Sequence, residues 1–107
     1  MQWTVVVLNA VVAAEIAALP DDMRARLARM VAVIQEHGFE ALPRNSVKHL
    51  DDKLWELRVT GRDGISRAIY VTASGRRVVI VHAFVKKTQK TLPRELAIAR
   101  LRAKEVR

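Results

Sequence analysis

The sequence predicts a small α+β domain, in which an antiparallel-rich sheet carries an N-terminal helical hairpin on one face and is followed by a C-terminal helix. The first observation behind this fold class is the order of the predicted elements, β-α-α-β-β-β-α, which suits one sheet covered by helices. The second is length, because 107 residues make a single domain, residues 1–107, with a core large enough to fold alone. The third is composition, because half of the residues are apolar and only 5% are aromatic, as in a globular core of Val, Leu, Ile and Ala.

The N-terminal segment predicts a strand followed by a helix. Residues 2–8 are rich in β-branched side chains, and we expect this strand to be buried on both faces. Asn9 is a favourable N-cap for a helix over residues 10–19, because its side-chain oxygen can accept a hydrogen bond from a free backbone N–H of the first turn. Pro20 then ends this helix.

A second helix is predicted to begin at Asp21 and to stop at Gly38. Asp21 and Asp22 complement the positive end of the helix dipole, and glycine is common where a helix ends. The apolar stripe at helical spacing consists of Met23, Leu27, Met30, Val31 and Ile34. The two helices should form the hairpin that covers the sheet.

Beyond a loop at residues 39–45, the apolar period changes from helical to β. Strands are predicted over residues 47–50, 54–60, 65–72 and 76–84. Short turns that contain glycine separate the last three of them, which should therefore form an antiparallel meander. Pro93 suits the first turn of a final helix that runs to about Val106. The apolar side of this helix would consist of Leu96, Ala97, Ile98 and Leu101.

Positive charge is concentrated in the second half of the chain. The net charge is +8, yet residues 1–43 hold three Arg against five acidic residues, so residues 44–107 carry +10. From Arg76 to Arg94 there are six cations and no acid. Such a field favours nucleic acid, an acidic protein or an anionic membrane surface as a partner.

Missing residue types exclude several classes of function. The chain has no cysteine, which rules out a disulfide scaffold and a thiolate nucleophile or metal ligand. Its three histidines are scattered, and it has neither a Gly-rich phosphate loop nor a nucleophile elbow, so we expect no metal and no small-molecule cofactor. The longest apolar run falls short of the roughly 18 residues of a membrane span, and no signal-peptide pattern precedes it. We therefore expect a soluble, cytoplasmic protein that makes no membrane contact.

Arg67 and His82 each interrupt a row of alternate, otherwise apolar residues on a predicted strand. If the two flanking turns contain four and two residues, Arg58 lies opposite Arg67 and Arg67 lies opposite His82. The three side chains would then form one line across the sheet, with residues 86–90 at its edge. An ion pair between Arg67 and Glu56, and a core role for His82, are the structural alternatives. The two rows are Ile65, Arg67, Ile69, Val71 and Val78, Ile80, His82, Phe84.

A line of cations with one imidazole is suited to cleaving RNA without a metal ion. RNA carries its own nucleophile, the 2′-hydroxyl, so a protein needs only to orient it, to stabilise charge on the scissile phosphate and to transfer protons. Arginine suits the phosphate because its planar fork donates two parallel hydrogen bonds.

Three strings in this region resemble successive signatures of a known family. They are LWELR at residues 54–58, SRAIY at residues 66–70 and HAFVKKTQKT at residues 82–91. Together they are similar to the phage-derived, HigB-like branch of the RelE/ParE toxin superfamily, whose fold also fits the preceding strand and helices. The resemblance implies a type II toxin that cleaves messenger RNA on the ribosome and is silenced by an antitoxin, which we expect to be a helix-turn-helix protein.

The resemblance also implies roles for individual residues. Strand arginines bind the scissile phosphate, while basic residues at the end of the last strand and in its loop supply proton transfer and RNA contacts. One departure is Ser66, since members often have Tyr at this position. The expected catalytic residues are Arg67, His82, Lys87 and Arg58. The expected RNA-binding residues are Lys86, Lys90, Arg76, Arg77, Lys48 and Arg94.

Two alternative functions fit the same fold. The first is a ParE-like inhibitor of DNA gyrase without nuclease activity, which would not require clustered cations and a histidine. The second is a non-catalytic module that binds RNA or the ribosome, in which the cations only neutralise phosphates.

Overall fold

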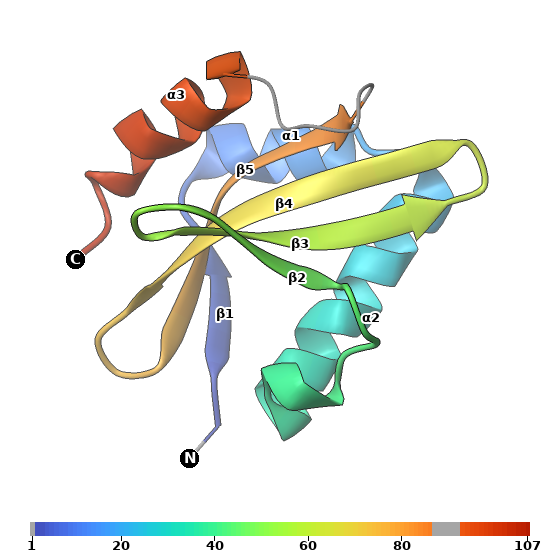
Figure 1. Ribbon diagram of the computed structural model, residues 1–107, viewed down its shortest axis with the longest axis horizontal. Helices are drawn as coiled ribbons and strands as arrows, with labels where there is room; N and C mark the ends of the chain where they lie inside the picture. Colours follow the sequence, from blue (N-terminus) through green and yellow to red (C-terminus); the bar gives the residue numbers. More distant parts are fainter. Residues whose placement is uncertain (1, 87–92) are drawn as a thin grey trace.

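A computed structural model describes residues 2–86 and 93–107 of the chain (Figure 1). The described part contains one mixed sheet of five strands in the order β1-β5-β4-β3-β2. Strand β1 is parallel to β5, and the other neighbouring pairs are antiparallel, which confirms the α+β class and the meander. The elements are β1 (Thr4–Val7), α1 (Ala10–Ala17), α2 (Asp21–His37), the short 3-10 helix η1 (Phe39–Ala41), β2 (Val47–Asp51), β3 (Leu54–Gly61), β4 (Gly64–Ala73), β5 (Arg77–Lys86) and α3 (Pro93–Ala103).

Helices cover both faces of the sheet, and each face has its own core. Helices α1 and α2 pack on one face, where Met23, Leu27 and Ile34 meet Leu57 and Val59. Helix α3 packs on the other face, and Figure 1 shows it apart from α2 with the strands between them. The second core consists of Leu54, Ile69, Val71, Val79, Val81 and Ala99. One side of the sheet is therefore covered by the N-terminal helices, and the other side is covered by α3.

Helix α1 begins where the sequence predicts and ends at Ala17, two residues before the predicted end, whereas the position of β1 in the sheet differs from the prediction. Asn9 caps α1 as expected, since its side chain accepts a hydrogen bond of 3.1 Å from the N–H of Val12. Strand β1 lies at the edge of the sheet, and Val6 and Val7 are 37% and 38% exposed. The expectation that this strand is buried on both faces is wrong, because β-branched composition reports strand propensity and not the place of a strand in the sheet.

The register between β4 and β5 differs from the expected one by two residues. The turn contains three residues instead of two, since Ala73 pairs with Arg77. A β-bulge at Val81 adds the second shift, so Arg67 lies opposite Phe84 instead of His82. The expected register from β3 to β4 is confirmed, because Arg58 lies opposite Arg67.

The bulge also divides the row of alternate residues on β5 between the two faces. Val78 and Ile80 belong to the core under α1 and α2. After the bulge, His82 lies opposite Ile69, which belongs to the core on the α3 face. His82 and Phe84 therefore share a face with Arg67, but Val78 and Ile80 do not.

Glu15 on α1 joins three elements at the edge of β5. Strand β1 pairs with β5 only as far as Ile80, and beyond it the N–H of Ala83 donates to Glu15 Oε1 at 3.1 Å. Arg102 of α3 donates to the same oxygen at 2.9 Å, and His82 Nδ1 lies 3.0 Å from it. Burial alone would raise the pKa of Glu15, but these hydrogen bonds outweigh it and hold the pKa below the usual 4.5.

Glu15→Gln should therefore change how stability depends on pH. A carboxylate whose pKa is lowered by folding stabilises the fold above its unfolded pKa, and this contribution is lost as the pH falls through the folded pKa. We expect the unfolding free energy of the variant at neutral pH to be about 1–2 kcal/mol lower than that of the wild type. On acidification, the unfolding free energy of the variant should fall less than that of the wild type. Urea denaturation from neutral to acid pH measures both effects.

The exposed Glu105 supplies the control. Glu105→Gln should follow the wild-type curve throughout. Equal acid dependence of the wild type and Glu15→Gln would contradict the role of Glu15 as the carboxylate that joins α1, β5 and α3.

Candidate functional site

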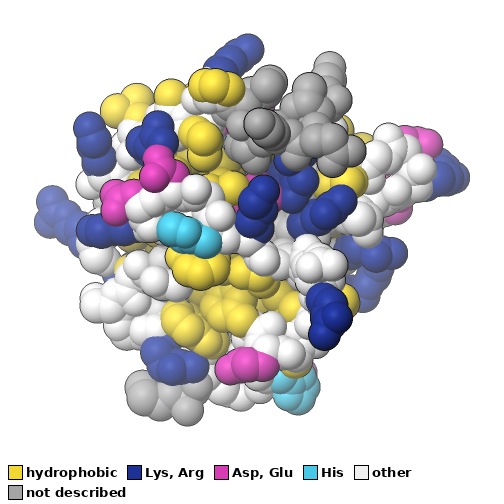
Figure 2. Space-filling view, viewed as in Figure 1, with side chains coloured by type: hydrophobic (Ala, Val, Ile, Leu, Met, Phe, Trp, Pro, Cys, Tyr) yellow, Lys and Arg dark blue, Asp and Glu magenta, His cyan; other side chains and the backbone are white. Residues whose placement is uncertain are grey.

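Five charged side chains gather on the α3 face, at the ends of the strands nearest the β3–β4 turn. They are Lys48, Glu56, Arg58, Arg67 and Lys86, and we call them the cationic cluster. Strand pairing puts them there, because Lys48 lies opposite Glu56, Arg58 opposite Arg67, and Lys86 opposite Ile65 in the row of Arg67. Four cations and one carboxylate give the cluster a charge of +3. Figure 2 shows Lys and Arg side chains close together near the centre of the view.

An ion pair between Arg67 and Glu56 forms the base of the cluster. Arg67 Nη1 donates to Glu56 Oε2, and the two side chains are only 5% and 0% exposed. This pair is the structural alternative that the sequence left open for Arg67. Burial lowers the pKa of Arg67 below its usual value, Glu56 opposes this effect and Arg58 adds to it. A buried charge requires such a partner, because its desolvation is otherwise too costly.

Three buried nitrogens of the cluster have no hydrogen-bond partner among residues 2–86 and 93–107. They are Nε of Arg58, Nε of Arg67 and Nζ of Lys86. Buried donors of this kind are rare in folded proteins, since each one has lost its water without gaining another acceptor. Cationic donors of this kind bind anions with several acceptor oxygens, and a phosphate group has this chemistry.

Lys86 is the member of the cluster that is best suited to exchange a proton. Burial lowers its pKa below the usual 10.5, and Arg67, Lys48 and Arg58 lower it further, whereas Glu56 acts in the opposite direction. A lysine changes its protonation state readily under such conditions, which an arginine does not. The sequence predicted that Lys86 contacts RNA, and it gave no sign that the pKa of Lys86 is lowered.

His82 lies in a different environment. It is 5% exposed, its Nδ1 lies 3.0 Å from Glu15 Oε1, and its Nε2 lies 2.8 Å from Glu95 Oε1. Its ring also stacks on Phe84 with 5.0 Å between centroids. The imidazole thus links α1 with α3, and its described hydrogen-bond partners lie outside the cationic cluster.

The remaining expected RNA-binding residues do not join the cluster in the described structure. Arg76 and Arg77 lie at the β4–β5 turn, at the opposite end of the strands. Arg76 stacks over Trp3 at 4.5 Å, and Arg77 donates to the carbonyl of Ser74 at 3.1 Å. Arg94 is exposed at the start of α3. Two more of the expected site residues, Lys87 and Lys90, lie outside the described residues.

Ser66 has no place in the site. It is fully buried and lies opposite Val59, in the core under α1 and α2. Its hydroxyl is 3.4 Å from the carbonyl oxygen of Val59, to which it donates. The side chain at this position therefore points to the face opposite Arg67.

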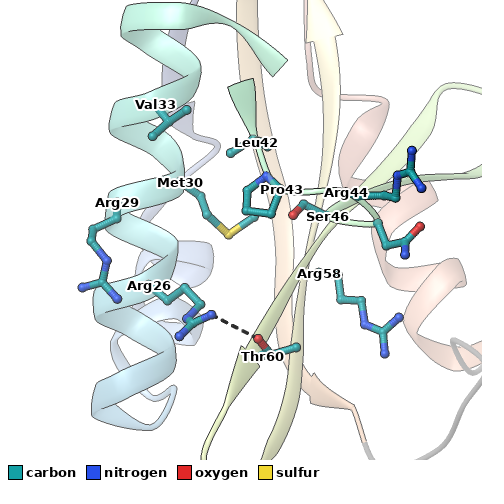
Figure 3. A pocket seen from close by; sticks show the side chains of 11 residues that line it. Arg26, Arg29, Met30, Val33, Leu42, Pro43, Arg44, Ser46, Arg58 and Thr60 are labelled. Atoms are coloured by element: carbon teal, nitrogen blue, oxygen red, sulfur yellow. Dashed lines mark hydrogen bonds between the residues drawn. The ribbon is translucent and has the colours of Figure 1, made fainter. Parts of the chain in front are cut away.

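Sequence reasoning missed a second set of cations beside the cluster. A groove of about 510 Å³ runs between α2 and the edge of β3, and Arg26, Arg29, Arg44 and Arg58 line it (Figure 3). Three of these arginines come from the part of the chain before β2, where acidic residues outnumber the cations. The spacing of Arg26 and Arg29, one helical turn apart on α2, was the available signal.

The described residues contain neither a metal-binding group of side chains nor a helix that could span a membrane. No group of three or more His, Asp or Glu side chains in these ranges is placed to hold a metal ion. None of the described helices combines the length and the apolar character needed to cross a bilayer.

Comparison with known proteins gives both a family and a fold. The family model of phage derived protein Gp49-like matches residues 14–104. A solved structure of an arginine-to-alanine mutant of the Escherichia coli toxin RelE, in the free state, superposes with a TM-score of 0.62 at 14% identity and covers 95% of this chain and 98% of that one. No curated protein matches the sequence. The expected RelE-superfamily fold is thus confirmed, and the chain belongs to the Gp49-like family of phage-derived proteins.

Proposed function

We propose that this protein is the toxin of a type II toxin–antitoxin system, and that it cleaves messenger RNA on the ribosome without a metal ion. The Gp49-like family and the RelE fold support a toxin. The observation that carries the nuclease activity is the set of three buried cationic nitrogens without a described partner, on Arg58, Arg67 and Lys86. An antitoxin with a helix-turn-helix domain is the expected partner, and the cytoplasm is the expected site of action.

Arg58 is the residue that we assign to the scissile phosphate. It is half-buried at the surface of the cluster, whereas Arg67 lies beneath it with one nitrogen on Glu56. The fork of Arg58 can donate to the non-bridging oxygens as the 2′-hydroxyl attacks the phosphorus. Negative charge increases on these oxygens in the transition state. The +3 charge of the cluster therefore stabilises the transition state more than the ground state.

Lys86 is the residue that we assign to the leaving group. The 2′-hydroxyl loses its proton to solvent, and its oxygen forms a bond to phosphorus. The bond between phosphorus and the 5′-oxygen breaks, which leaves a cyclic phosphate. Protonated Lys86 gives its proton to that oxygen. His82 then acts as a structural link between α1 and α3, and Lys87 stays a predicted donor that lies outside the described residues.

Arg58→Gln tests the assignment of the phosphate ligand. Loss of one donor to a developing oxyanion costs about a hundredfold in rate or more, so we expect messenger RNA cleavage to fall by about this factor. Cleavage is measured in a reconstituted translation reaction by primer extension. Arg58 is a cleaner target than Arg67, because removal of Arg67 would take a buried cation away from Glu56 and disturb folding.

Lys104→Gln is the charge-matched control, since Lys104 is exposed beyond the last residue of α3. It should cleave at the wild-type rate. Undiminished cleavage by Arg58→Gln would contradict the assignment. If the wild type inhibits DNA supercoiling by gyrase and leaves messenger RNA intact, the proposed nuclease activity is wrong. If it binds RNA in a salt-sensitive way without any cleaved product, the protein is a binding module and not a nuclease.

The pH dependence of cleavage tests Lys86. A general acid must be protonated, so activity should fall as the pH rises through the pKa of Lys86, which is below the usual 10.5. Lys86→Arg keeps the positive charge but does not titrate, so it should cleave more slowly and without this alkaline decline. Single-turnover rates on ribosome-bound messenger RNA, from neutral to alkaline pH, measure both effects. An identical alkaline decline in Lys86→Arg would rule out Lys86 as the acid.

A further inference from the structure

The groove between α2 and β3 is continuous with the cationic cluster at the edge of the sheet. Strand β2 pairs with β3 only as far as Leu57. The last backbone hydrogen bond along this edge of β3, 2.8 Å long, runs from the N–H of Arg58 to the carbonyl of Ser46. Beyond it, none of the described strands covers this edge of β3. Arg26 on α2 reaches that open edge and donates to the hydroxyl of Thr60 at 3.3 Å.

Thr60 and Arg58 are two residues apart on β3, so their side chains lie on the same face of the strand. Figure 3 shows Arg26 directed from α2 toward Thr60, and Arg58 extending away from the helix. Arg58 thus belongs to both sites, to the cluster through its pairing with Arg67 and to the groove as a lining residue. Whatever binds in the groove must come close to the phosphate that the cluster holds.

The chemistry of the groove suits a nucleotide. Its volume of about 510 Å³ lies within the range of small-molecule sites. Its described lining includes four arginines and no acid, with an apolar floor of Met30, Val33, Leu42 and Pro43. Arg29 and Arg44 make no ion pair with any described residue, so their guanidinium groups are available. Arginine forks bind phosphodiesters in pairs of hydrogen bonds, and their planes also stack on bases.

We infer that the groove is a second RNA subsite, which binds the nucleotide next to the scissile phosphate and holds its phosphodiester on Arg26, Arg29 and Arg44. This inference rests on the proposed nuclease, because that activity places RNA at Arg58. An acidic protein segment is the competing occupant. Continuity with the cluster favours RNA, since a single phosphodiester chain can contact Arg58 and the groove with successive phosphates.

The test measures RNA affinity separately from cleavage. A short single-stranded RNA with 2′-fluoro sugars cannot be cleaved, and its binding to the wild type is compared with that to Arg26→Gln/Arg29→Gln. We expect about fivefold weaker binding, and a salt slope smaller by about 0.7, because the two arginines neutralise the same single phosphate. Arg44→Gln is a second variant in an exposed loop, and Lys104→Gln is the control that should bind normally.

A neutral methylphosphonate, placed at each linkage of the RNA in turn, locates the contact. One linkage should weaken binding to the wild type but not to the double variant. Equal affinity of all variants for every RNA would overturn the subsite. It would also be overturned if the binding of poly-glutamate depended on Arg26 and Arg29 and the binding of RNA did not. If cleavage fails but RNA affinity depends on the groove, the subsite stands without the nuclease. If Arg58→Gln loses cleavage and the groove variants bind normally, the nuclease stands without the subsite.

Discussion

The buried ion pair between Glu56 and Arg67 is the interaction on which the candidate site depends. Arg67 is the buried cation among the four and requires a counter-charge, which Glu56 supplies from a position with no solvent access. The pair also fixes the direction of the Arg67 side chain beneath Arg58, because one guanidinium nitrogen is bound. Loss of one member of such a pair typically costs about 3–5 kcal/mol, so fold and site are linked at this point.

Local geometry of β5 then decides which basic groups join the site. The bulge at Val81 moves the end of the strand by one residue relative to β4, and it brings Lys86 opposite Ile65 on the face of Arg67. The same shift leaves His82 between Glu15 and Glu95. The histidine therefore holds the helices that surround the site, while the lysine at the end of the strand occupies the site itself. In the proposed mechanism, positioning by His82 and proton transfer by Lys86 are thus divided between two residues only four apart.

The sequence predicted the fold class and most elements, since periodicity, caps and glycine turns are local signals. It also predicted the pairing of Arg58 with Arg67, because residues 61–64 contain a glycine at each end. It could not predict the register of β4 with β5, since neither the third turn residue nor the bulge at Val81 leaves a pattern in the chain. The groove was missed for a related reason, as it forms only when α2 packs against the open edge of β3.

The central claim is that the three nitrogens of the cationic cluster without a partner among the described residues bind the RNA phosphate. Its most direct test is side-chain NMR of the labelled protein. The Nε–H signals of arginine and the ammonium signal of Lys86 are followed as a non-cleavable RNA dinucleotide is added. We expect the signals of Arg58, Arg67 and Lys86 to shift together at saturation, while those of Arg76, Arg77 and the His82 ring stay unchanged. Shifts confined to Arg76 and Arg77, with the cluster unaffected, would contradict it.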